Sequence, residues 1–343
     1  MINKDIYAVL LAGGKGTRLW PLSMEGYSKP FIRFGKRKLL LEDAIERMQG
    51  IVCRKNIVIV IDKAKAKLLR RFIKGISKKN ILVEPFGRNT ASAIGLAAIN
   101  LKPESLMVVF PADQFIENLG NFKKTIKEGL NFIKGRKEAL LCLGTVPTGI
   151  SESFGYIKVS KSVTGNIFCA EKFVEKPSLA KAGKFLRNPD YLWNAGIFIF
   201  RAGAILEAIK RCAPLLYKNL QRIKKDKRNI LSAYSQMKNI SIDYQVMEKT
   251  KNLYCLKGKF RWQDIGNWVS LDKLFKKDRE GNICVGKVSL AGVSNSIVYN
   301  SGKHTIGAIG LKDMVIVHTD NGTLVCAKRD AEKVKELVKL GGK

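Results

Sequence analysis

The chain has 343 residues, and its 62 lysines and arginines outnumber 29 aspartates and glutamates, which gives a formal net charge of +33 at pH 7. This length exceeds the size at which one hydrophobic core usually keeps growing, so we expect one large domain and a smaller one. No stretch approaches the ~20 apolar residues that span a bilayer, and the first residues lack the charged-then-apolar pattern of a secretion signal, so we expect a cytoplasmic protein.

The first predicted element is a strand at residues 8–12, where an uninterrupted apolar run ends in glycines, as in a parallel strand covered on both faces. Glycines at positions 13, 14 and 16 let the backbone approach an anion closely, and Lys15 and Arg18 add positive charge. Such a loop suits a triphosphate. Neither the Walker A pattern nor the dinucleotide-binding glycine pattern is present, and the spacing alone leaves open a turn that binds nothing.

Strands and helices then alternate along the chain. The segments are a helix at 39–48, a strand at 57–61, a basic amphipathic helix at 63–76, a strand at 80–83, a helix of small residues at 92–101 and buried strands at 106–110 and 139–144. This alternation predicts an α/β fold with a doubly wound, mixed but mostly parallel sheet. Ligands of such sheets bind at the carboxyl ends of the strands, where the glycine loop is expected to lie.

Polar residues directly follow two of these strands. Residues 84–91, Glu-Pro-Phe-Gly-Arg-Asn-Thr-Ala, come after the third strand and either hold a ligand or cap the next helix through Asn89 or Thr90. Asp113 follows the fourth strand. Its carboxylate is either a helix cap or a hard oxygen ligand of the kind that Mg²⁺ prefers.

Two further polar positions lie on strands in the second half of the chain. Glu175 and Lys176 end a strand at a proline, and because adjacent strand residues face opposite sides, no simple ion pair between them is expected. Asn194 is the one polar side chain of an apolar strand at 191–200 and would be costly to bury without a partner. Either a bound ligand or the backbone could supply that partner.

Two isolated acids follow. Asp243 lies in the first turn of a helix that Ser241 is expected to cap, where the helix dipole also favours an acid. Asp264 stands between aromatic residues and before a glycine.

After residue 281 the composition shifts to short β-branched runs separated by Gly, Asn and Ser. The runs lie at 283–288, 295–299, 305–309, 314–318 and 323–326, and a basic helix is expected at 330–340. This pattern predicts a small β domain. We therefore expect a domain at residues 1–276 and a second one at residues 277–343.

The glycine loop is part of a longer motif, Leu11-Ala-Gly-Gly-Lys-Gly-Thr-Arg-Leu-Trp-Pro-Leu-Ser23, followed by Ser28-Lys29-Pro30. This motif resembles the signature of the nucleotidyltransferases that make sugar nucleotides, most closely the mannose-1-phosphate guanylyltransferase (GDP-mannose pyrophosphorylase) family. The segments that extend the similarity over roughly the first 270 residues lie at 84–91, 111–114, 145–157, 173–177, 193–196, 241–249 and 262–268. The tail resembles the short β-helix-like domain of the bacterial enzymes, often used for dimer contacts.

The resemblance implies a role for each matched residue. The nucleotide would be held by Leu11, Gly13, Gly14, Gly16, Thr17, Glu84, Arg88, Asn89 and Thr90, of which the 84–91 segment points to guanine. Arg18 and Lys29 would stabilise the β- and γ-phosphates as pyrophosphate leaves. The sugar phosphate would contact Gly155, Tyr156, Glu175, Lys176, Asn194 and Asp243. Mg²⁺ would be bound by Asp113 and Asp264.

The chain departs from the family pattern at three places. Gln114 replaces a histidine after the predicted metal ligand, Ser153-Phe154 replaces a Gly-Tyr pair, and Asn267 stands where serine is more usual. The chain also ends before the position of the sugar-isomerase domain found in bifunctional relatives. We expect GTP and mannose 1-phosphate as substrates and a homodimer as the assembly.

The reaction that the resemblance implies is GTP plus mannose 1-phosphate giving GDP-mannose and pyrophosphate. His304 and His318 are the only histidines and lie far from the predicted sheet in sequence, which argues against a hydrolase triad, and the seven scattered cysteines are expected to be reduced core residues. A sibling enzyme that uses UTP or dTTP with glucose 1-phosphate, and a catalytically silent sugar-nucleotide-binding regulatory protein, are the alternatives. The intact Arg18, Lys29, Asp113 and Asp264 argue against the silent protein.

The large positive charge indicates either a nucleic-acid surface or solvated helix faces on a protein with a polyanionic substrate. The lysines are spread over residues 63–79, 123–137, 218–227 and 328–343. None of these runs interleaves aromatic residues as base-stacking surfaces do. We therefore expect no specific nucleic-acid partner.

Overall fold

The computed structural model describes residues 5–14, 16–23, 28–35 and 37–340. The chain divides into two compact units that interleave in sequence. The first unit comprises Met1–Gly13, Ala44–Ala112 and Ile116–Trp262, and the second comprises Gly14–Asp43, Asp113–Phe115 and Gln263–Lys343. The domain boundary expected after residue 276 stays a prediction.

The first unit is built on a nine-stranded sheet in the order β3-β2-β1-β4-β9-β6-β10-β8-β7. The strands are β1 (Ile6–Leu11), β2 (Ile57–Asp62), β3 (Ile81–Glu84), β4 (Leu106–Pro111), β6 (Leu140–Thr145), β7 (Tyr156–Thr164), β8 (Ile167–Val174), β9 (Tyr191–Arg201) and β10 (Leu253–Lys257). Within this sheet β8 and β9 run against the direction that the other strands share. The predicted mixed, mostly parallel α/β sheet is confirmed.

The parallel half of the sheet sets the position of the functional loops. β1 pairs with β2 and β4, and β2 pairs with β3, all in parallel. Leu11 is the register partner of Pro111, and Asp62 is the partner of Glu84. The carboxyl ends of these strands therefore lie at one edge of the sheet. Three connections begin at this edge: the glycine loop at Gly13, the turn after Asp62 and the loop after Glu84.

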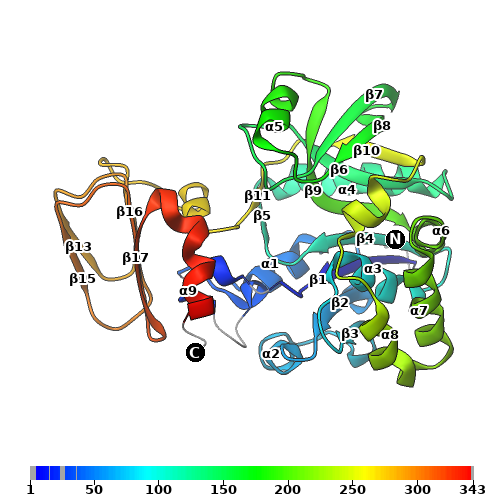
Figure 1. The fold of residues 1–343 in the computed structure, drawn as a ribbon, viewed down its shortest axis with the longest axis horizontal. Coiled ribbons are helices and arrows are strands. Elements are labelled where there is room, and N and C mark those ends of the chain that lie inside the picture. The colour runs from blue at the N-terminus through cyan, green and yellow to red at the C-terminus, as the bar shows by residue number, and fades with distance from the viewer. Residues whose placement is uncertain (1–4, 15, 24–27, 36, 341–343) are drawn as a thin grey trace. The chain divides into compact units, whose positions relative to one another are not determined.

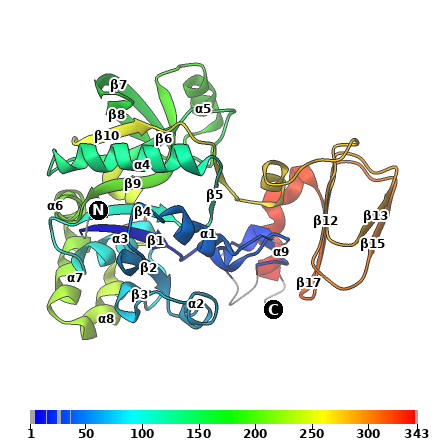
Figure 2. The same cartoon turned by 180° about the vertical axis from the view of Figure 1, so that it is seen from behind.

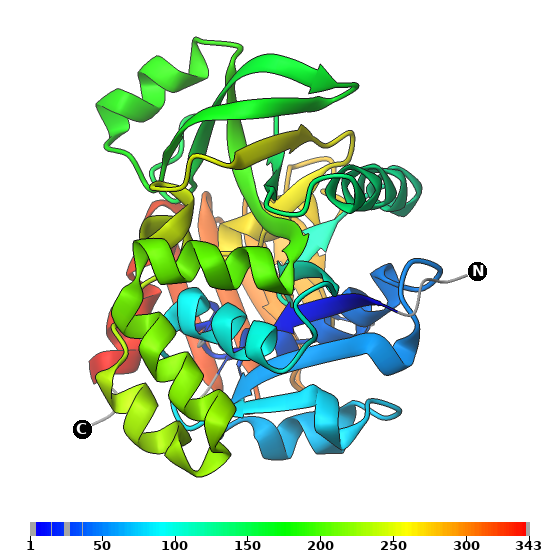
Figure 3. The same cartoon turned by 90° about the vertical axis from the view of Figure 1, so that its right-hand side faces the viewer.

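Helices cover both faces of this sheet. They are α2 (Ala66–Phe72), α3 (Asn89–Ile99), α4 (Leu119–Lys134), α5 (Leu179–Leu186), α6 (Ala202–Cys212), α7 (Pro214–Lys225) and α8 (Ile230–Gln236), while α1 (Leu40–Arg47) belongs partly to each unit. On β9, Phe198 and Phe200 belong to the core that contains α3, α6 and α7. Ile199 faces the other way, where Gly129 of α4 lies against it. Figure 3 shows these two helical layers, with α4 seen nearly end-on.

Close packing of α3 explains its composition. Every residue from Ala91 to Ile99 is buried, and the helix contacts both α6 and α7 (Figure 1). A Cβ atom added at Gly95 would collide with the Leu220 side chain of α7. The small residues therefore allow three helices to pack on one face of the sheet.

The second unit contains a four-stranded sheet in the order β12-β14-β16-β17 and a two-stranded sheet of β13 and β15. The strands are β12 (Ile283–Val285), β13 (Val288–Ala291), β14 (Ile297–Asn300), β15 (Ile306–Ile309), β16 (Met314–Thr319) and β17 (Gly322–Ala327). Successive turns place β12, β14 and β16 in parallel, and β13 parallel to β15, so the chain coils as a short β-helix (Figure 2). The predicted C-terminal β domain is confirmed.

The second unit also contains several short helices. They are the 3₁₀ turns η1 (Thr17–Leu19), η2 (Lys29–Phe31), η7 (Trp268–Lys273) and η8 (Lys328–Lys333), with α9 (Val334–Leu340). Leu19, Trp268, Tyr299 and Val334 share one buried core. The chain passes between the units in β5 (Gln114–Ile116) and β11 (Trp262–Asp264), which pair with each other.

Several helix ends differ from the sequence predictions. The helix expected at 92–101 is α3 at Asn89–Ile99, and the basic helix expected at 330–340 is a 3₁₀ segment at Lys328–Lys333 followed by α9 at Val334–Leu340. The basic helix expected at 63–76 is confined to Ala66–Phe72. The helix expected to start at Ser241 is a π-helical turn at Asp243–Met247, in which the Ser241 hydroxyl accepts a hydrogen bond from the Tyr244 N–H at 3.4 Å. Among the helices that the structure describes, none is long and apolar enough to cross a membrane.

Candidate functional site

The end of β1 is the starting point of the site in the first unit. The Ala12 N–H donates to the Val60 carbonyl at 2.9 Å, so the chain stays on the sheet to the last residue before the glycines. The Gly13 carbonyl accepts a hydrogen bond from Lys65 Nζ at 2.6 Å, and a Cβ atom added at Gly13 would lie 3.9 Å from Glu84 Oε2. Gly13, Lys65 and Glu84 are therefore neighbours at the carboxyl edge of the sheet.

Glu84 is a buried carboxyl group with only 4% of its surface exposed. The Ser92 hydroxyl donates to Glu84 Oε1 at 3.5 Å. Burial raises the pKa of Glu84 to about 7, because an ionised carboxylate loses hydration inside the protein. A carboxyl group that changes charge near neutral pH at a strand end is suited to ligand recognition.

The other predicted nucleotide residues of this loop divide into two groups. Arg88 donates through Nε to the Tyr234 carbonyl at 3.0 Å, and the Thr90 hydroxyl accepts from the Ile242 N–H at 2.9 Å. Both side chains thus hold the loop against the segment that leads into the π-helical turn. Asn89, by contrast, has a positive φ of 67° and is the residue that starts α3.

A second polar cluster of the first unit contains the predicted sugar residues. Asn194 donates through Nδ2 to Asp243 Oδ1 at 2.9 Å, and Asn194 Oδ1 accepts from the Gly196 N–H at 3.0 Å. Burial raises the pKa of Asp243. The Asn194 side chain therefore uses a backbone partner, as one alternative held, and also a buried acid from the π-helical turn.

Gly155 and Tyr156 have distinct places in this cluster. A Cβ atom added at Gly155 would lie 2.5 Å from Glu175 Oε2, so only glycine lets that carboxylate approach the strand. Tyr156 is fully buried and packs against Trp193 and Phe185. Gly155 therefore leaves space for the Glu175 carboxylate, whereas the Tyr156 ring belongs to the aromatic packing next to the cluster.

The prediction that Glu175 and Lys176 form no ion pair is wrong. Lys176 Nζ lies 3.5 Å from Glu175 Oε1. Lys176 has a φ of 48°, so it leaves the extended conformation in which neighbouring side chains face opposite sides. Burial raises the pKa of Glu175 to about 7, and the nearby charge of Asp243 acts in the same direction.

The second unit contains the two predicted metal ligands, and a lysine joins them. Lys29 Nζ lies 3.0 Å from Asp113 Oδ2 and 2.7 Å from Asp264 Oδ1. Lys29 is 6% exposed, and although burial alone would lower its pKa, the two carboxylates raise it to about 12. Three residues that are far apart in the sequence thus form one charged cluster.

The glycines of the loop allow this cluster to form. Gly16 has a φ of 67°, which is unfavourable for other residues, and a Cβ atom there would lie 2.7 Å from Lys29 Cβ. A Cβ atom added at Gly14 would lie 3.7 Å from Asp113 Oδ2. The backbone therefore approaches the cluster closely at both positions, while Lys15 lies outside the described residues.

Two converging carboxylates fit a Mg²⁺ site that substrate phosphates complete. Mg²⁺ is usually bound by one or two carboxylates together with phosphate oxygens and water. Within the part of the chain that the structure describes, no group of three or more His, Cys, Asp and Glu side chains could hold a metal ion. Asp113 and Asp264 already share one cation, the Lys29 ammonium, so their carboxylates converge on positive charge.

Arg18 has a partner that the sequence did not suggest. Its Nε lies 2.8 Å from Glu332 Oε2, and Asn267 donates through Nδ2 to Glu332 Oε1 at 2.5 Å. All three residues belong to the second unit. Glu332 lies more than 300 residues from Arg18 in a basic segment without a motif, so local sequence offered no signal for this pair. Thr17 precedes Arg18 in η1.

The structure therefore places the predicted residues in three groups. Leu11, Gly13, Glu84, Arg88, Asn89 and Thr90 lie at the sheet edge of the first unit, and Gly155, Tyr156, Glu175, Lys176, Asn194 and Asp243 form its second cluster. Gly14, Gly16, Thr17, Arg18, Lys29, Asp113 and Asp264 belong to the second unit. The hydrogen bond from Ile242 to Thr90 links the first two groups, because Asp243 follows Ile242 directly.

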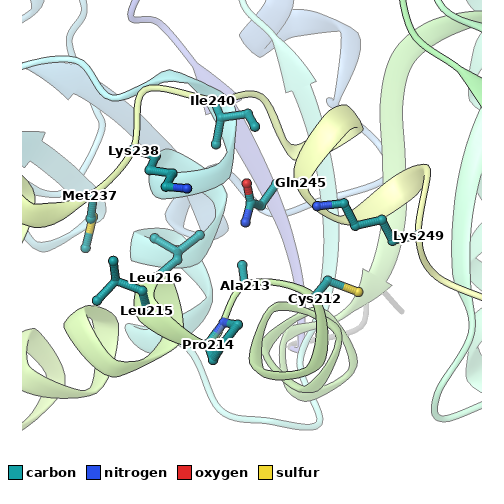
Figure 4. Close-up of a pocket in the computed structure, with 10 residues that line it drawn as sticks. All are labelled: Cys212, Ala213, Pro214, Leu215, Leu216, Met237, Lys238, Ile240, Gln245 and Lys249. Carbon is teal, nitrogen blue, oxygen red and sulfur yellow. The ribbon is translucent and has the colours of Figure 1, made fainter.

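A separate groove of about 440 Å³ lies in the first unit between α7 and the segment that follows α8. Its lining is mainly apolar, and Figure 4 shows Gln245 and the amino groups of Lys238 and Lys249 directed toward the same hollow. None of the predicted site residues lines it. The groove is therefore distinct from both polar clusters.

Comparison with known proteins finds a family model for each part of the chain. Residues 7–281 match the family model described as Nucleotidyl transferase. Residues 288–340 match a model described as MannoseP isomerase/GMP-like beta-helix domain.

Individual relatives match over almost the whole chain. A mannose-1-phosphate guanylyltransferase of Escherichia coli is 34% identical over 100% of this chain and 75% of its own length. A Vibrio cholerae protein assigned the same activity is 35% identical over 96% of this chain and 73% of its own. A crystal structure from Thermus thermophilus, described as a mannose-1-phosphate geranyltransferase, has a TM-score of 0.91 and 31% identity and covers 99% of this chain and 100% of its own. The chain therefore belongs to the nucleotidyl transferase family, among the mannose-1-phosphate guanylyltransferases.

Proposed function

We propose that the protein transfers GMP from GTP to mannose 1-phosphate and so produces GDP-mannose and pyrophosphate. The observation that supports this reaction best is the cluster of Lys29, Asp113 and Asp264 beside Gly14 and Gly16. The cluster combines a buried cation with two converging acids next to a glycine loop. Relatives at 34% and 35% identity carry out or are assigned this reaction.

The chemistry requires positioning and charge stabilisation more than proton transfer. The phosphate of the sugar is already ionised near neutral pH and attacks the α-phosphorus of GTP, while pyrophosphate leaves on the opposite side. Arg18 and Lys29 stabilise the negative charge that develops on the leaving pyrophosphate. Asp113 and Asp264 would hold Mg²⁺, which would supply further positive charge to the substrate phosphates.

Nucleotide recognition is assigned to the edge of the sheet in the first unit. An ionised Glu84 can accept hydrogen bonds, and guanine, unlike uracil or thymine, offers an amide N–H with an adjacent amino group. Arg88 and Thr90 act indirectly in this proposal, because their polar atoms hold the Tyr234–Ile242 segment. Leu11, Gly13 and Asn89 line the remaining approach to the base and phosphates.

Sugar recognition is assigned to the cluster around Asn194 and Asp243. The acids Glu175 and Asp243 accept hydrogen bonds from sugar hydroxyl groups, and the half-exposed Lys176 contacts the sugar phosphate. We further propose that the enzyme acts in the cytoplasm as a homodimer. The dimer is supported by the resemblance of the β-helix to the tail that bacterial relatives use for such contacts.

Initial rates of pyrophosphate release test the reaction. They are measured for the purified protein with each of GTP, ATP, CTP, UTP and dTTP, combined with mannose 1-phosphate or glucose 1-phosphate. We expect the highest kcat/KM for GTP with mannose 1-phosphate. A clear preference for UTP or dTTP with glucose 1-phosphate would establish the sibling activity instead, and no release with any pair would favour the silent regulatory protein.

Replacement of Lys176 tests the sugar-phosphate contact. We expect Lys176→Ala to raise the KM for mannose 1-phosphate by about tenfold or more while the KM for GTP changes little, because the ammonium contacts only the sugar phosphate. The matched control is Lys161→Ala, an exposed lysine on β7 of the same unit. An equal rise in both KM values would indicate that Lys176 supports the fold of the strand end and does not bind the sugar phosphate.

A further inference from the structure

Lys65 is a buried lysine that belongs to none of the motifs. It is 8% exposed, whereas Lys63 and Lys67 on either side of it are exposed. Its Nζ lies 2.5 Å from Asp62 Oδ2 and donates to the Gly13 carbonyl at 2.6 Å. Asp62 Oδ1 also accepts from the Lys65 N–H at 3.2 Å, so the acid fixes both ends of the lysine.

A buried ion pair is weak evidence for stability, because desolvation of the two charges offsets much of their attraction. Lys65 directly precedes α2, but stabilisation of this helix does not explain the Asp62–Lys65 pair. Lys65 also donates to the carbonyl of Gly13, at the end of the strand that carries the glycine loop. Its location points to a role in shaping that loop.

The contact with Gly13 fixes the orientation of a peptide. The peptide bond is planar and trans, so the Gly13 carbonyl and the following N–H point in opposite directions. Because glycine tolerates many conformations, this peptide would otherwise rotate at low cost. The Lys65 ammonium holds the carbonyl toward the protein and so directs the other side of the peptide away from Lys65.

Lys65 also stands beside two acids. Asp62 and Glu84 are register partners at the ends of adjacent strands, so their negative charges repel each other. The charge of Asp62 raises the pKa of Glu84, and the charge of Lys65 lowers it, although burial has the largest effect. Ser92 of α3 and Tyr234 of α8 are the other polar groups that face Glu84. Loss of Lys65 would therefore make Glu84 harder to ionise.

We propose that Lys65, held by Asp62, is a positioning residue for the nucleotide: it orients the Gly13 peptide for the phosphates and shields Glu84 from the charge of Asp62. The proposal rests on the assignment of this sheet edge to the nucleotide. It gives Lys65 no contact with the reacting atoms. It predicts an effect on nucleotide binding that exceeds any effect on sugar binding.

The test compares Lys65→Met with Lys67→Met, which removes an exposed lysine two residues further along. We expect Lys65→Met to raise the KM for GTP by about tenfold or more, with the KM for mannose 1-phosphate changed less than threefold, and Lys67→Met to change neither. The acid limb of kcat/KM for GTP should shift to higher pH in Lys65→Met. Lys65→Arg, which keeps the charge, should restore part of the GTP affinity.

Thermal unfolding separates this role from a structural one. If Lys65→Met does not fold, Asp62→Asn provides the second variant. We expect Asp62→Asn to raise the KM for GTP by a smaller factor and to leave the KM for mannose 1-phosphate unchanged. A folded Lys65→Met enzyme with an unchanged KM for GTP, or with equal rises in both KM values and an unshifted pH profile, overturns the proposal. If the wild-type enzyme prefers another nucleoside triphosphate, the proposed function fails, and the same comparison is made with that nucleotide.

Discussion

Asp113→Asn and Asp264→Asn are each expected to reduce turnover at least ~100-fold, the scale of losing one preorganised electrostatic element, while the protein stays folded. Asparagine keeps the size of the side chain but removes the negative charge that attracts Mg²⁺. The carboxylates of Asp113 and Asp264 lie 3.0 and 2.7 Å from the same Lys29 ammonium. We expect Mg²⁺ to need both of them, so that one carboxylate cannot compensate for loss of the other. Steady-state rates at saturating GTP and mannose 1-phosphate, over a range of Mg²⁺ concentrations, give the result.

The control for this pair is Asp320→Asn, because Asp320 is an exposed acid in a turn of the same unit. It should retain wild-type turnover. Part of the activity of the Asp113 and Asp264 variants should return at high Mg²⁺ concentration, since a weakened site can still be filled. Near-normal turnover in either variant at ordinary Mg²⁺ concentration would remove that aspartate from the mechanism.

Lys29→Met is expected to lower both turnover and stability. Turnover should fall by about 100-fold or more, because the variant loses the cation assigned to the leaving pyrophosphate. Stability should fall by roughly 1 kcal/mol, because two acids remain without their shared partner; exposure of Asp264 keeps this below the cost of a fully buried broken pair. Steady-state kinetics and thermal unfolding measure the two effects separately.

Added Mg²⁺ distinguishes a shared cation site from ordinary packing. In Lys29→Met, Mg²⁺ should raise the unfolding temperature more than it does in the wild type, because the ion can neutralise both carboxylates. Lys312→Met, at an exposed lysine of the same unit, should match the wild type in turnover and in its response to Mg²⁺. If Lys29→Met keeps full turnover, Lys29 only neutralises the two acids and takes no part in the reaction.

The sequence predicted the parallel strands and the strand-end residues because their signals are local. β1, β2 and β4 are continuous apolar runs, as strands buried on both faces must be, and polar residues begin where these strands end. The same pattern placed Glu84 and Asp113 at strand ends. Their roles came from resemblance to a family, because the 84–91 segment could equally have capped a helix through Asn89 or Thr90, and Asp113 could have been a cap itself.

Features that depend on distant segments could not be predicted. The contact of Lys29 with both Asp113 and Asp264 spans 235 residues at its widest, and the partner of Arg18 is an acid near the end of the chain. Lys65 resembled its exposed neighbours, and only the fold shows that it is buried against Gly13. The Glu175–Lys176 pair was missed because it depends on one positive φ angle that the sequence does not reveal.

We expect this enzyme to select GTP and mannose 1-phosphate over the other nucleoside triphosphates and over glucose 1-phosphate. The most direct measurement is a competition in which the protein, Mg²⁺, all five nucleoside triphosphates and both hexose 1-phosphates are mixed at equal concentrations, and the sugar nucleotides formed are identified by mass spectrometry at early times. We expect GDP-mannose as the main product, accompanied by an equal amount of pyrophosphate. A predominance of UDP-glucose or dTDP-glucose, or the absence of any sugar nucleotide, would contradict this expectation.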